Sequence, residues 1–272
     1  MVRFIDTHNH VGLAELDESL EVMGRKASSV GVVAGVITTG CLEDFERARE
    51  VAHRLGWGYC VGLHPMYLHE QSDEDVQKLK KFVYEHMDDS HLVGIGEIGL
   101  DFYVSQPDKA LQERIFKKEL ELAAETHLPV SVHSRRALYR VMAMMADYPQ
   151  VRGALHAFVG SEQEALQCVR RGYFLGFGGS MTYEGSKRVR RALASLGSQA
   201  LLLETDAPDM APSFAENGRS TPVDLPRYLQ EMSRIRGEDS EALGRVIYEN
   251  SFLAFPRLRN VVELTKNFVA TA

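Results

Sequence analysis

The chain has 272 residues and a formal net charge of −7, and 44% of its residues are hydrophobic and 25% charged, which is ordinary usage for a globular protein. The negative charge argues against a protein that binds duplex nucleic acid tightly through a broad basic face, although it does not exclude an enzyme that grips one strand end. The sequence contains no apolar run of about 18 residues, so we expect no membrane-spanning segment.

The three cysteines, Cys41, Cys60 and Cys168, lie far apart and form no C-x-x-C pair. We therefore expect buried thiols in a reducing compartment rather than disulfides or a thiolate metal site. The chain does not open with a basic segment followed by a long apolar stretch, so we expect no signal peptide and a cytoplasmic location. Nothing in the sequence indicates an obligate protein partner.

Short apolar or β-branched segments alternate with amphipathic segments along the whole chain. We predict eight strands, at residues 2–6, 33–38, 58–63, 92–97, 129–133, 153–156, 172–177 and 200–204. We predict helices at residues 42–55, 73–87, 106–127, 137–148, 162–171, 185–196, 222–236 and 240–254. The clearest is 106–127, in which apolar residues recur at the three- and four-residue spacing of a helix face.

This order of elements predicts an α/β fold, a (β/α)8 TIM barrel that forms a single domain over residues 1–272. Several of the strands are continuous apolar runs, as expected for strands that are buried on both faces. The structural alternative is an open doubly wound sheet, but its usual nucleotide fingerprint, G-x-G-x-x-G, is absent.

Side chains that can bind metal ions follow six of the eight predicted strands. His8 and His10 follow the first strand, and because residues i and i+2 of an extended segment point to the same side, both imidazoles can face one point. The other five strand ends carry His64, Glu97, His133, His156 and Asp206. Barrel enzymes build their active sites at the carboxyl ends of the strands, so this convergence predicts an active site rather than six separate packing roles.

These residues lie in motifs that carry a family resemblance: D-T-H-N-H, G-L-H-P, G-E-I-G-L-D, V-H-S-R, H-A-F-V-G and L-E-T-D-A-P occur in this order. From Arg3 to about Phe255 the chain resembles the TatD-type metal-dependent hydrolases of the amidohydrolase superfamily. The resemblance implies a (β/α)8 barrel, divalent metals, and DNase or 3′-to-5′ exonuclease activity. Some members are similar to deacylases of misacylated tRNA.

The resemblance also implies a two-metal site. One cation would be held by His8, His10 and Asp206, the other by His133 and His156, and Glu97 would bridge the two. Two-metal sites of this kind stabilise both the attacking and the leaving oxygen of a phosphodiester. Histidine ligands favour zinc, manganese or iron over magnesium. Magnesium remains a fourth candidate for the metal, because the resemblance implies a family that tolerates it.

Further roles follow from the resemblance and from the positions of residues near the predicted ligands. Asp206 would also act as the general base for the attacking water, and His64 would face the substrate phosphate and stabilise the departing oxygen. Arg135 lies two residues beyond His133 and could bind a phosphate as a fork, or could instead form a salt bridge to Asp101 or Glu204. Asp101 would orient a ligand histidine, and Asp6 could do the same or could instead cap a loop.

The chain departs from the family pattern at two places. Asn9 replaces a common cysteine between the first two histidines, and Val11 and Gly12 replace a Leu-Asp pair. Near the end, Ser220 stands where an asparagine is usual, two residues before Pro222. We expect this second loop to touch substrate, so the change concerns substrate specificity rather than metal chemistry.

The favoured hypothesis is a divalent-metal-dependent phosphodiester hydrolase, of the deoxyribonuclease or exonuclease type, that acts on nucleic-acid ends. The alternative keeps the metals but changes the bond, as in an ester or amide hydrolase such as an aminoacyl-tRNA deacylase. A third hypothesis is a barrel whose metal is only structural. Structural zinc sites are closed and often rich in thiolates, whereas the ligands here come from separate strands and include no cysteine, which favours an open catalytic site.

Overall fold

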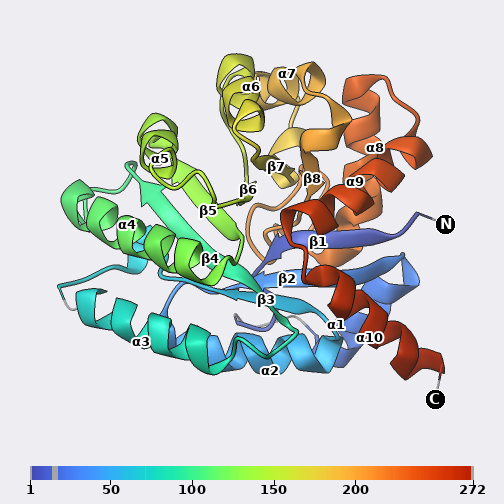
Figure 1. Ribbon diagram of the computed structural model, residues 1–272. Coiled ribbons are helices and arrows are strands. Elements are labelled where there is room, and N and C mark those ends of the chain that lie inside the picture. Colours follow the sequence, from blue (N-terminus) through green and yellow to red (C-terminus); the bar gives the residue numbers. More distant parts are fainter. Residues whose placement is uncertain (1, 14–17, 71, 271–272) are drawn as a thin grey trace.

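The computed structural model describes residues 2–13, 18–70 and 72–270. Its eight strands are arranged in chain order in one sheet, and every neighbouring pair is parallel. Figure 1 shows the strands curling into a nearly closed barrel. The strands are β1 (Phe4–Asn9), β2 (Val32–Thr38), β3 (Gly58–Val61), β4 (Leu92–Asp101), β5 (Val130–Arg135), β6 (Gly153–Leu155), β7 (Phe174–Phe177) and β8 (Leu201–Leu203).

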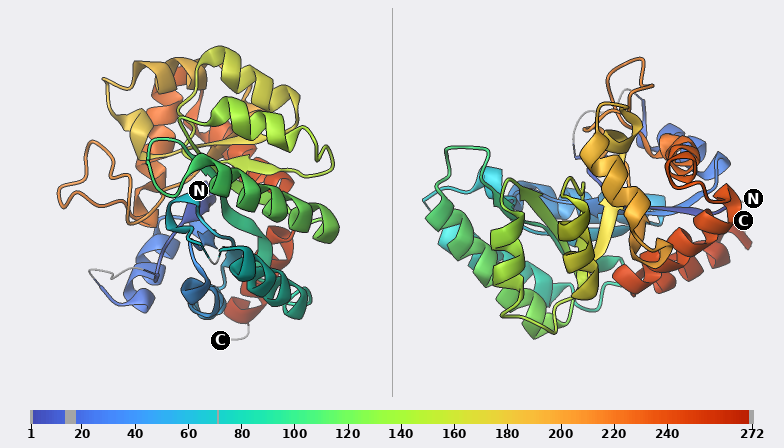
Figure 2. Two further views of the ribbon diagram at one scale, coloured as in Figure 1. Left: turned by 90° about the vertical axis from the view of Figure 1, so that its left-hand side faces the viewer. Right: turned by 90° about the horizontal axis from the view of Figure 1, so that it is seen from above.

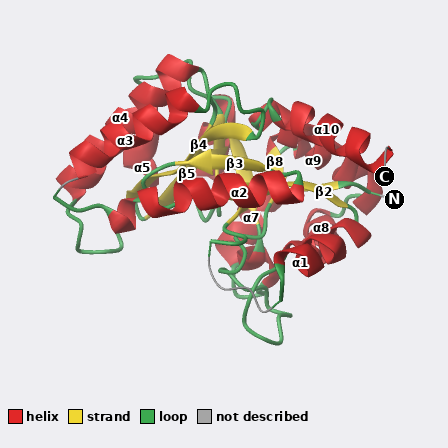
Figure 3. Ribbon diagram, turned by 90° about the horizontal axis from the view of Figure 1, so that it is seen from below, coloured by secondary structure: helices red, strands yellow, loops and turns green. Residues whose placement is uncertain are grey.

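Helices surround the strands, as the views in Figure 2 and Figure 3 show. They are α1 (Leu20–Ser29), α2 (Phe45–Leu55), α3 (Ser72–Glu85), α4 (Lys109–Thr126), α5 (Leu138–Met145), α6 (Glu162–Arg170), α7 (Lys187–Ser195), α8 (Leu225–Arg236), α9 (Ser240–Ala254) and α10 (Leu258–Ala270). The predicted (β/α)8 barrel is therefore confirmed. Within the described residues, the structure has no helix of sufficient length and apolarity to span a membrane.

Three strands run further than their apolar patterns predict, and all three carry residues of interest. β1 continues through His8 to Asn9, β4 continues through Glu97 to Asp101, and β5 continues through His133 to Arg135. The predicted strand ends at residues 6, 97 and 133 were therefore wrong. The polar residues extend the strands because they still pair: Asn9 lies opposite Ile37 of β2, and Asp101 lies opposite Arg135 of β5. All residues of β1 and β4 are buried.

The barrel is completed between β8 and β1 by individual hydrogen bonds. The Thr7 hydroxyl donates to the carbonyl oxygen of Leu203 at 3.0 Å, and the Thr205 amide donates to Asp6 Oδ1 at 2.8 Å. The amide of Asp206 donates to the carbonyl oxygen of His8 at 2.9 Å. The Asp6 carboxylate is therefore paired with Thr205 and anchors the segment after β8. Of the two roles considered for Asp6, the orientation of a ligand histidine was wrong.

Two helices lie outside the sequence prediction. α1 buries only Leu20, Met23 and Ala27, and Gly24 interrupts it, so its apolar pattern is weak. α10 follows the last predicted helix and packs Leu258, Val261 and Val262 into the core. Cys60 and Cys168 are buried free thiols, as expected, whereas Cys41 is half-buried.

The contact between β4 and β5 depends on a glycine. Gly99 has a φ of 136°, a conformation that side chains rarely adopt, and a Cβ there would collide with the carbonyl oxygen of His133. We predict that Gly99→Ala lowers the free energy of unfolding by about 2–4 kcal/mol, because backbone strain adds to overpacking. Urea unfolding followed by circular dichroism measures this difference.

The matched control is Gly185→Ala, where an added methyl group meets nothing within 4 Å. That variant is expected to stay within about 0.5 kcal/mol of the parent chain. Equal unfolding midpoints for the two variants would show that the close approach of β4 and β5 is not needed.

Candidate metal centre

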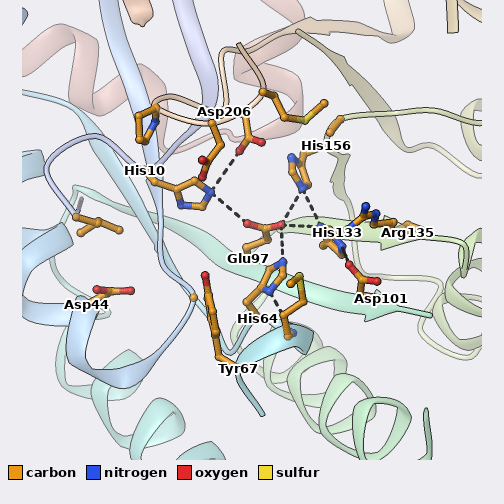
Figure 4. A pocket seen from close by; sticks show the side chains of 18 of the residues that line it. His10, Asp44, His64, Tyr67, Glu97, Asp101, His133, Arg135, His156 and Asp206 are labelled. Carbon is orange, nitrogen blue, oxygen red and sulfur yellow. Dashed lines mark hydrogen bonds and ion pairs between the residues drawn. The ribbon is translucent and has the colours of Figure 1, made fainter. Parts of the chain in front are cut away.

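Side chains from six strands or strand ends meet at one mouth of the barrel. A cavity of about 690 Å³ opens there, and it is lined by His10, His64, Glu97, Asp101, His133, Arg135, His156 and Asp206, among others. Figure 4 shows these side chains converging on Glu97. His8 is fully buried below the cavity and also contacts Glu97. The structure thus brings together all the candidate residues that the sequence indicated.

The two carboxylate oxygens of Glu97 face different histidines. Glu97 Oε2 lies 3.3 Å from His8 Nε2 and 3.4 Å from His10 Nε2. Glu97 Oε1 lies 2.8 Å from His156 Nε2, 3.0 Å from His133 Nδ1 and 3.2 Å from His64 Nε2. One buried carboxylate therefore stands between two separate sets of imidazole nitrogens.

A second carboxylate completes the first of these sets. Asp206 Oδ1 lies 3.3 Å from His10 Nε2 and 3.5 Å from His8 Nε2. Asp206 has a φ of 56°, which is uncommon for a residue other than glycine, and its carboxylate faces His10 (Figure 4). The ligand-type atoms of His8, His10 and Asp206 lie within 4.8 Å of one another.

Three of the remaining ring nitrogens are held from outside the cluster. His8 Nδ1 lies 2.8 Å from the Ser131 hydroxyl, and His10 Nδ1 lies 2.8 Å from the carbonyl oxygen of Thr38. His133 Nε2 lies 3.0 Å from Asp101 Oδ2, as the sequence predicted for Asp101. Such contacts fix the orientation and tautomer of a histidine, so that its other nitrogen is free to bind a cation.

Burial and mutual charge shift the pKa values of the cluster. Burial by itself would raise the pKa of Glu97, but the charges on His156, His64 and His8 hold that pKa well below its usual range. Burial lowers the pKa of His8 to about 4. Burial also lowers the pKa of His156, but the facing Glu97 carboxylate and other nearby carboxylates outweigh this effect and raise the pKa to about 9. At neutral pH a cation would therefore replace a proton on His156.

The donor set fits a divalent cation. Imidazole nitrogens and carboxylate oxygens suit zinc, manganese and iron. In the described part of the chain, the buried Asp206 Oδ1 lacks a hydrogen-bond partner of ordinary geometry. Because an unpaired buried acceptor is costly, it is better satisfied by a positive ion than by the protein alone.

Arg135 lies at the edge of the cavity and takes neither of the salt bridges considered for it. Its guanidinium stacks 3.8 Å from the centroid of the Tyr103 ring, and the described residues give it no ion pair with Asp101 or Glu204. Stacking leaves the guanidinium N–H groups available to a ligand. Sequence analysis missed Tyr103, although its position two residues after Asp101 was a usable signal.

The segment from Ser220 to Pro222 does not line this cavity. The Ser220 hydroxyl donates to the carbonyl oxygen of Thr205 at 2.9 Å and lies 2.9 Å from the Tyr228 hydroxyl. Ser220 and its neighbours line a different cavity, beside Pro208. The expectation that this departure bears on substrate specificity therefore lacks support, and the serine instead braces the segment after β8.

Comparisons with known proteins agree with this geometry. The family model described as TatD related DNase matches residues 5–256. The chain is 31% identical to the uncharacterized metal-dependent hydrolase YjjV of Escherichia coli (strain K12), over 93% of this chain and 98% of that protein. It is 35% identical to the 3′-5′ ssDNA/RNA exonuclease TatD of Cronobacter sakazakii, over 83% and 88% of the two chains.

The fold comparison points the same way. The crystal structure of YjjV, a TatD homologue from Escherichia coli, superposes with a TM-score of 0.88 at 30% identity, over 94% of this chain and 98% of that one.

The contact between Asp101 and His133 generates a prediction about metal affinity. In Asp101→Asn, the amide would donate to His133 Nε2 and leave the ring proton on Nδ1, the nitrogen that faces Glu97. We expect zinc to bind roughly 10–100-fold more weakly, as measured by calorimetric titration. The control is Asp147→Asn, because Asp147 is exposed and outside the cavity. Unchanged zinc affinity in Asp101→Asn would show that this contact does not set the ring orientation.

Proposed function

The chain belongs to the TatD-related DNase family, and from this premise we propose that it is a divalent-metal-dependent phosphodiester hydrolase acting on nucleic-acid strands. That it is a metal-dependent hydrolase of ester bonds follows from the family. The proposal that the substrate is a phosphodiester rests on Glu97. Its two carboxylate oxygens face separate sets of histidines, at distances of 2.8–3.4 Å. A carboxylate placed in this way suits a bridge between two cations.

In this proposal one cation is held by His8, His10 and Asp206, a second by His133 and His156, and Glu97 is shared. Zinc, manganese, iron or magnesium would serve. When bound, such cations lower the pKa of water and draw charge from a phosphoryl oxygen. The protein's part is to hold the phosphodiester against this pair, to accept the proton of the attacking water and to support the departing oxygen.

Asp206 is the proposed acceptor of that proton. Burial would raise its pKa, but His10, His156 and His8 together lower it, so the group is a charged carboxylate at neutral pH. It also lines the cavity in which substrate would lie. A charged carboxylate within reach of the attacking water meets the requirement for a general base.

In this proposal His64 donates a hydrogen bond rather than binding a cation, although its ligand atom lies within 4.8 Å of those of Glu97 and His133. Its Nδ1 accepts from the amide of Met66 at 3.2 Å, and burial lowers its pKa, so the neutral ring carries its proton on Nε2. That N–H faces the cavity and Glu97. If Nε2 bound a cation, Nδ1–H would have to oppose the Met66 N–H. We therefore propose that His64 supports the departing or a non-bridging oxygen of the phosphate.

Arg135 is the proposed phosphate-binding residue at the cavity edge. It is exposed, and its guanidinium lies flat on Tyr103 at 3.8 Å, which holds the fork in one orientation. A fixed guanidinium binds phosphate through two parallel hydrogen bonds at a smaller entropic cost than a free one.

The test of the function is a parallel assay on single-stranded oligonucleotides and on a charged tRNA, with each of the four metals added to metal-free protein. We expect oligonucleotide hydrolysis that a chelator abolishes, while circular dichroism shows the fold largely retained, because the barrel's apolar layers stabilise it. Turnover of the charged tRNA alone would replace the phosphodiesterase proposal with an ester hydrolase. Collapse of the fold on chelation would make the metals structural.

Asp206→Asn tests the general base. Asparagine keeps an oxygen for coordination but does not take up a proton at neutral pH. We expect kcat to fall by at least about a hundredfold, the lower range for a positioned general base, with a smaller change in KM and some metal still bound. Asp209→Asn, which alters a neighbouring carboxylate of the same cavity, is the control. Near-parental turnover in Asp206→Asn would remove Asp206 from the role of base.

His64→Ala separates metal binding from substrate binding. Both metal equivalents should remain, since the other six residues provide the ligands, and turnover should fall roughly a hundredfold. The loss should shrink for a nitrophenyl phosphodiester, whose leaving group needs less support. His69→Ala, in the same loop but outside this cavity, serves as control. If elemental analysis of His64→Ala shows one metal equivalent lost, His64 is a ligand and the assignment is wrong.

A further inference from the structure

A second cavity adjoins the metal centre and has no role in the chemistry described so far. It has a volume of about 360 Å³ and lies between the segments that follow β5 and β6. Ser134, His156 and Val159 line both this cavity and the larger one. Because these three residues line both spaces, the second cavity lies directly beside the metal centre. We call this second space the side groove.

The wall shared with β5 carries positive charge that the described residues do not neutralise. Arg135 lines the metal-centre cavity and Arg136 lines the side groove. Both are exposed, and both stack on Tyr103, with their guanidinium carbons 3.8 and 4.7 Å from the ring centroid. No carboxylate of the described residues forms an ion pair with either. The other arginine of the groove, Arg188, is already paired with Glu164 at 2.6 Å.

The opposite side of the metal centre has the opposite charge. Asp44 lines the large cavity and lies across Glu97 from Arg135 (Figure 4). The described residues offer it no cationic partner. A polyanion held at the metal centre is therefore repelled on the Asp44 side and attracted on the Arg135 side. This difference gives a bound strand one direction in which to continue.

One further side chain suits a nucleotide rather than a simple anion. Tyr139 lies at the outer edge of the groove with 88% of its surface exposed, so its ring is open to a stacking partner. An open aromatic face beside a positive wall is the arrangement by which proteins bind single strands without reading their sequence.

We propose that the side groove binds the nucleotide that follows the scissile dinucleotide held at the metal centre, so that a single strand runs from Glu97 past Ser134 toward Tyr139. Arg135 and Arg136 contact successive phosphates, and Tyr139 stacks on a base. The proposal rests on the proposed function and makes it more specific: the substrate is single-stranded nucleic acid longer than a dinucleotide. A duplex does not present separate bases to a groove of this kind.

The test compares Arg136→Gln and Tyr139→Ala with the control Arg140→Gln on a series of oligonucleotides from dinucleotide to octanucleotide. Arg140 is an exposed neighbour on α5 that pairs with Glu113 at 2.7 Å and does not line the groove. In the parent chain and the control, kcat/KM should rise with length and then level off. In Arg136→Gln and Tyr139→Ala the rise should be reduced about tenfold, at the low end for losing one stacked base, while dinucleotide turnover stays unchanged.

Salt dependence distinguishes the two contacts. Removing one phosphate contact should reduce the slope of log affinity against log salt concentration by roughly 0.7 for a single strand. Arg136→Gln should show this change, and Tyr139→Ala should weaken binding with the slope unaltered. If all three variants keep the length dependence of the parent chain, the strand does not use the side groove and the proposal is wrong.

A binding measurement keeps this outcome separate from failure of the proposed function. Fluorescence anisotropy of a labelled octanucleotide, with chelator present so that no hydrolysis occurs, reports occupancy of the groove without turnover. If the parent chain hydrolyses no oligonucleotide, the proposed function fails. A loss of octanucleotide affinity in Arg136→Gln and Tyr139→Ala, but not in Arg140→Gln, would still support the groove, and equal affinities would overturn it.

Discussion

A single buried carboxylate organises the mouth of this barrel. Glu97 presents one oxygen to His8 and His10 and the other to His133, His156 and His64, all within 3.4 Å. A charged carboxylate at this depth is costly unless positive charge surrounds it. Five histidines from four strands or strand ends, stacked and edge-packed against one another, provide that environment. The same arrangement that stabilises the charge is the arrangement that can receive cations.

The fold delivers this geometry because the strands around Glu97 are held at short range. β4 is buried along its whole length, and Gly99 allows β5 to approach until His133 faces Glu97. On the other side, hydrogen bonds from Thr7, Thr205 and Asp206 draw β8 onto β1. Asp206 therefore stands beside His8 and His10 although it is far from them in sequence. A small increase in the distance between β4 and β5, or between β8 and β1, would separate the two sets of ligand residues.

The sequence predicted the barrel and the residues at its mouth for one reason: both follow from periodicity. Apolar runs alternate with helical patterns, and polar residues such as His64 and Asp206 follow directly after such runs. What the pattern could not show is the continuation of pairing through polar residues, which places His8 and Glu97 inside strands. Nor could it show the contacts of Asp6 and Ser220, because a side chain's partner across the barrel depends on register. Helix α1 was missed because three buried apolar residues and a glycine form too weak a pattern.

The account's central claim is that Glu97 is shared by two cations. The most direct measurement is an anomalous difference map from crystals of the protein grown with manganese. The account predicts two peaks, one among His8, His10 and Asp206 and one beside His133 and His156, with Glu97 between them. A single peak at saturating manganese, or a second peak held by His64 in place of His156, would contradict it.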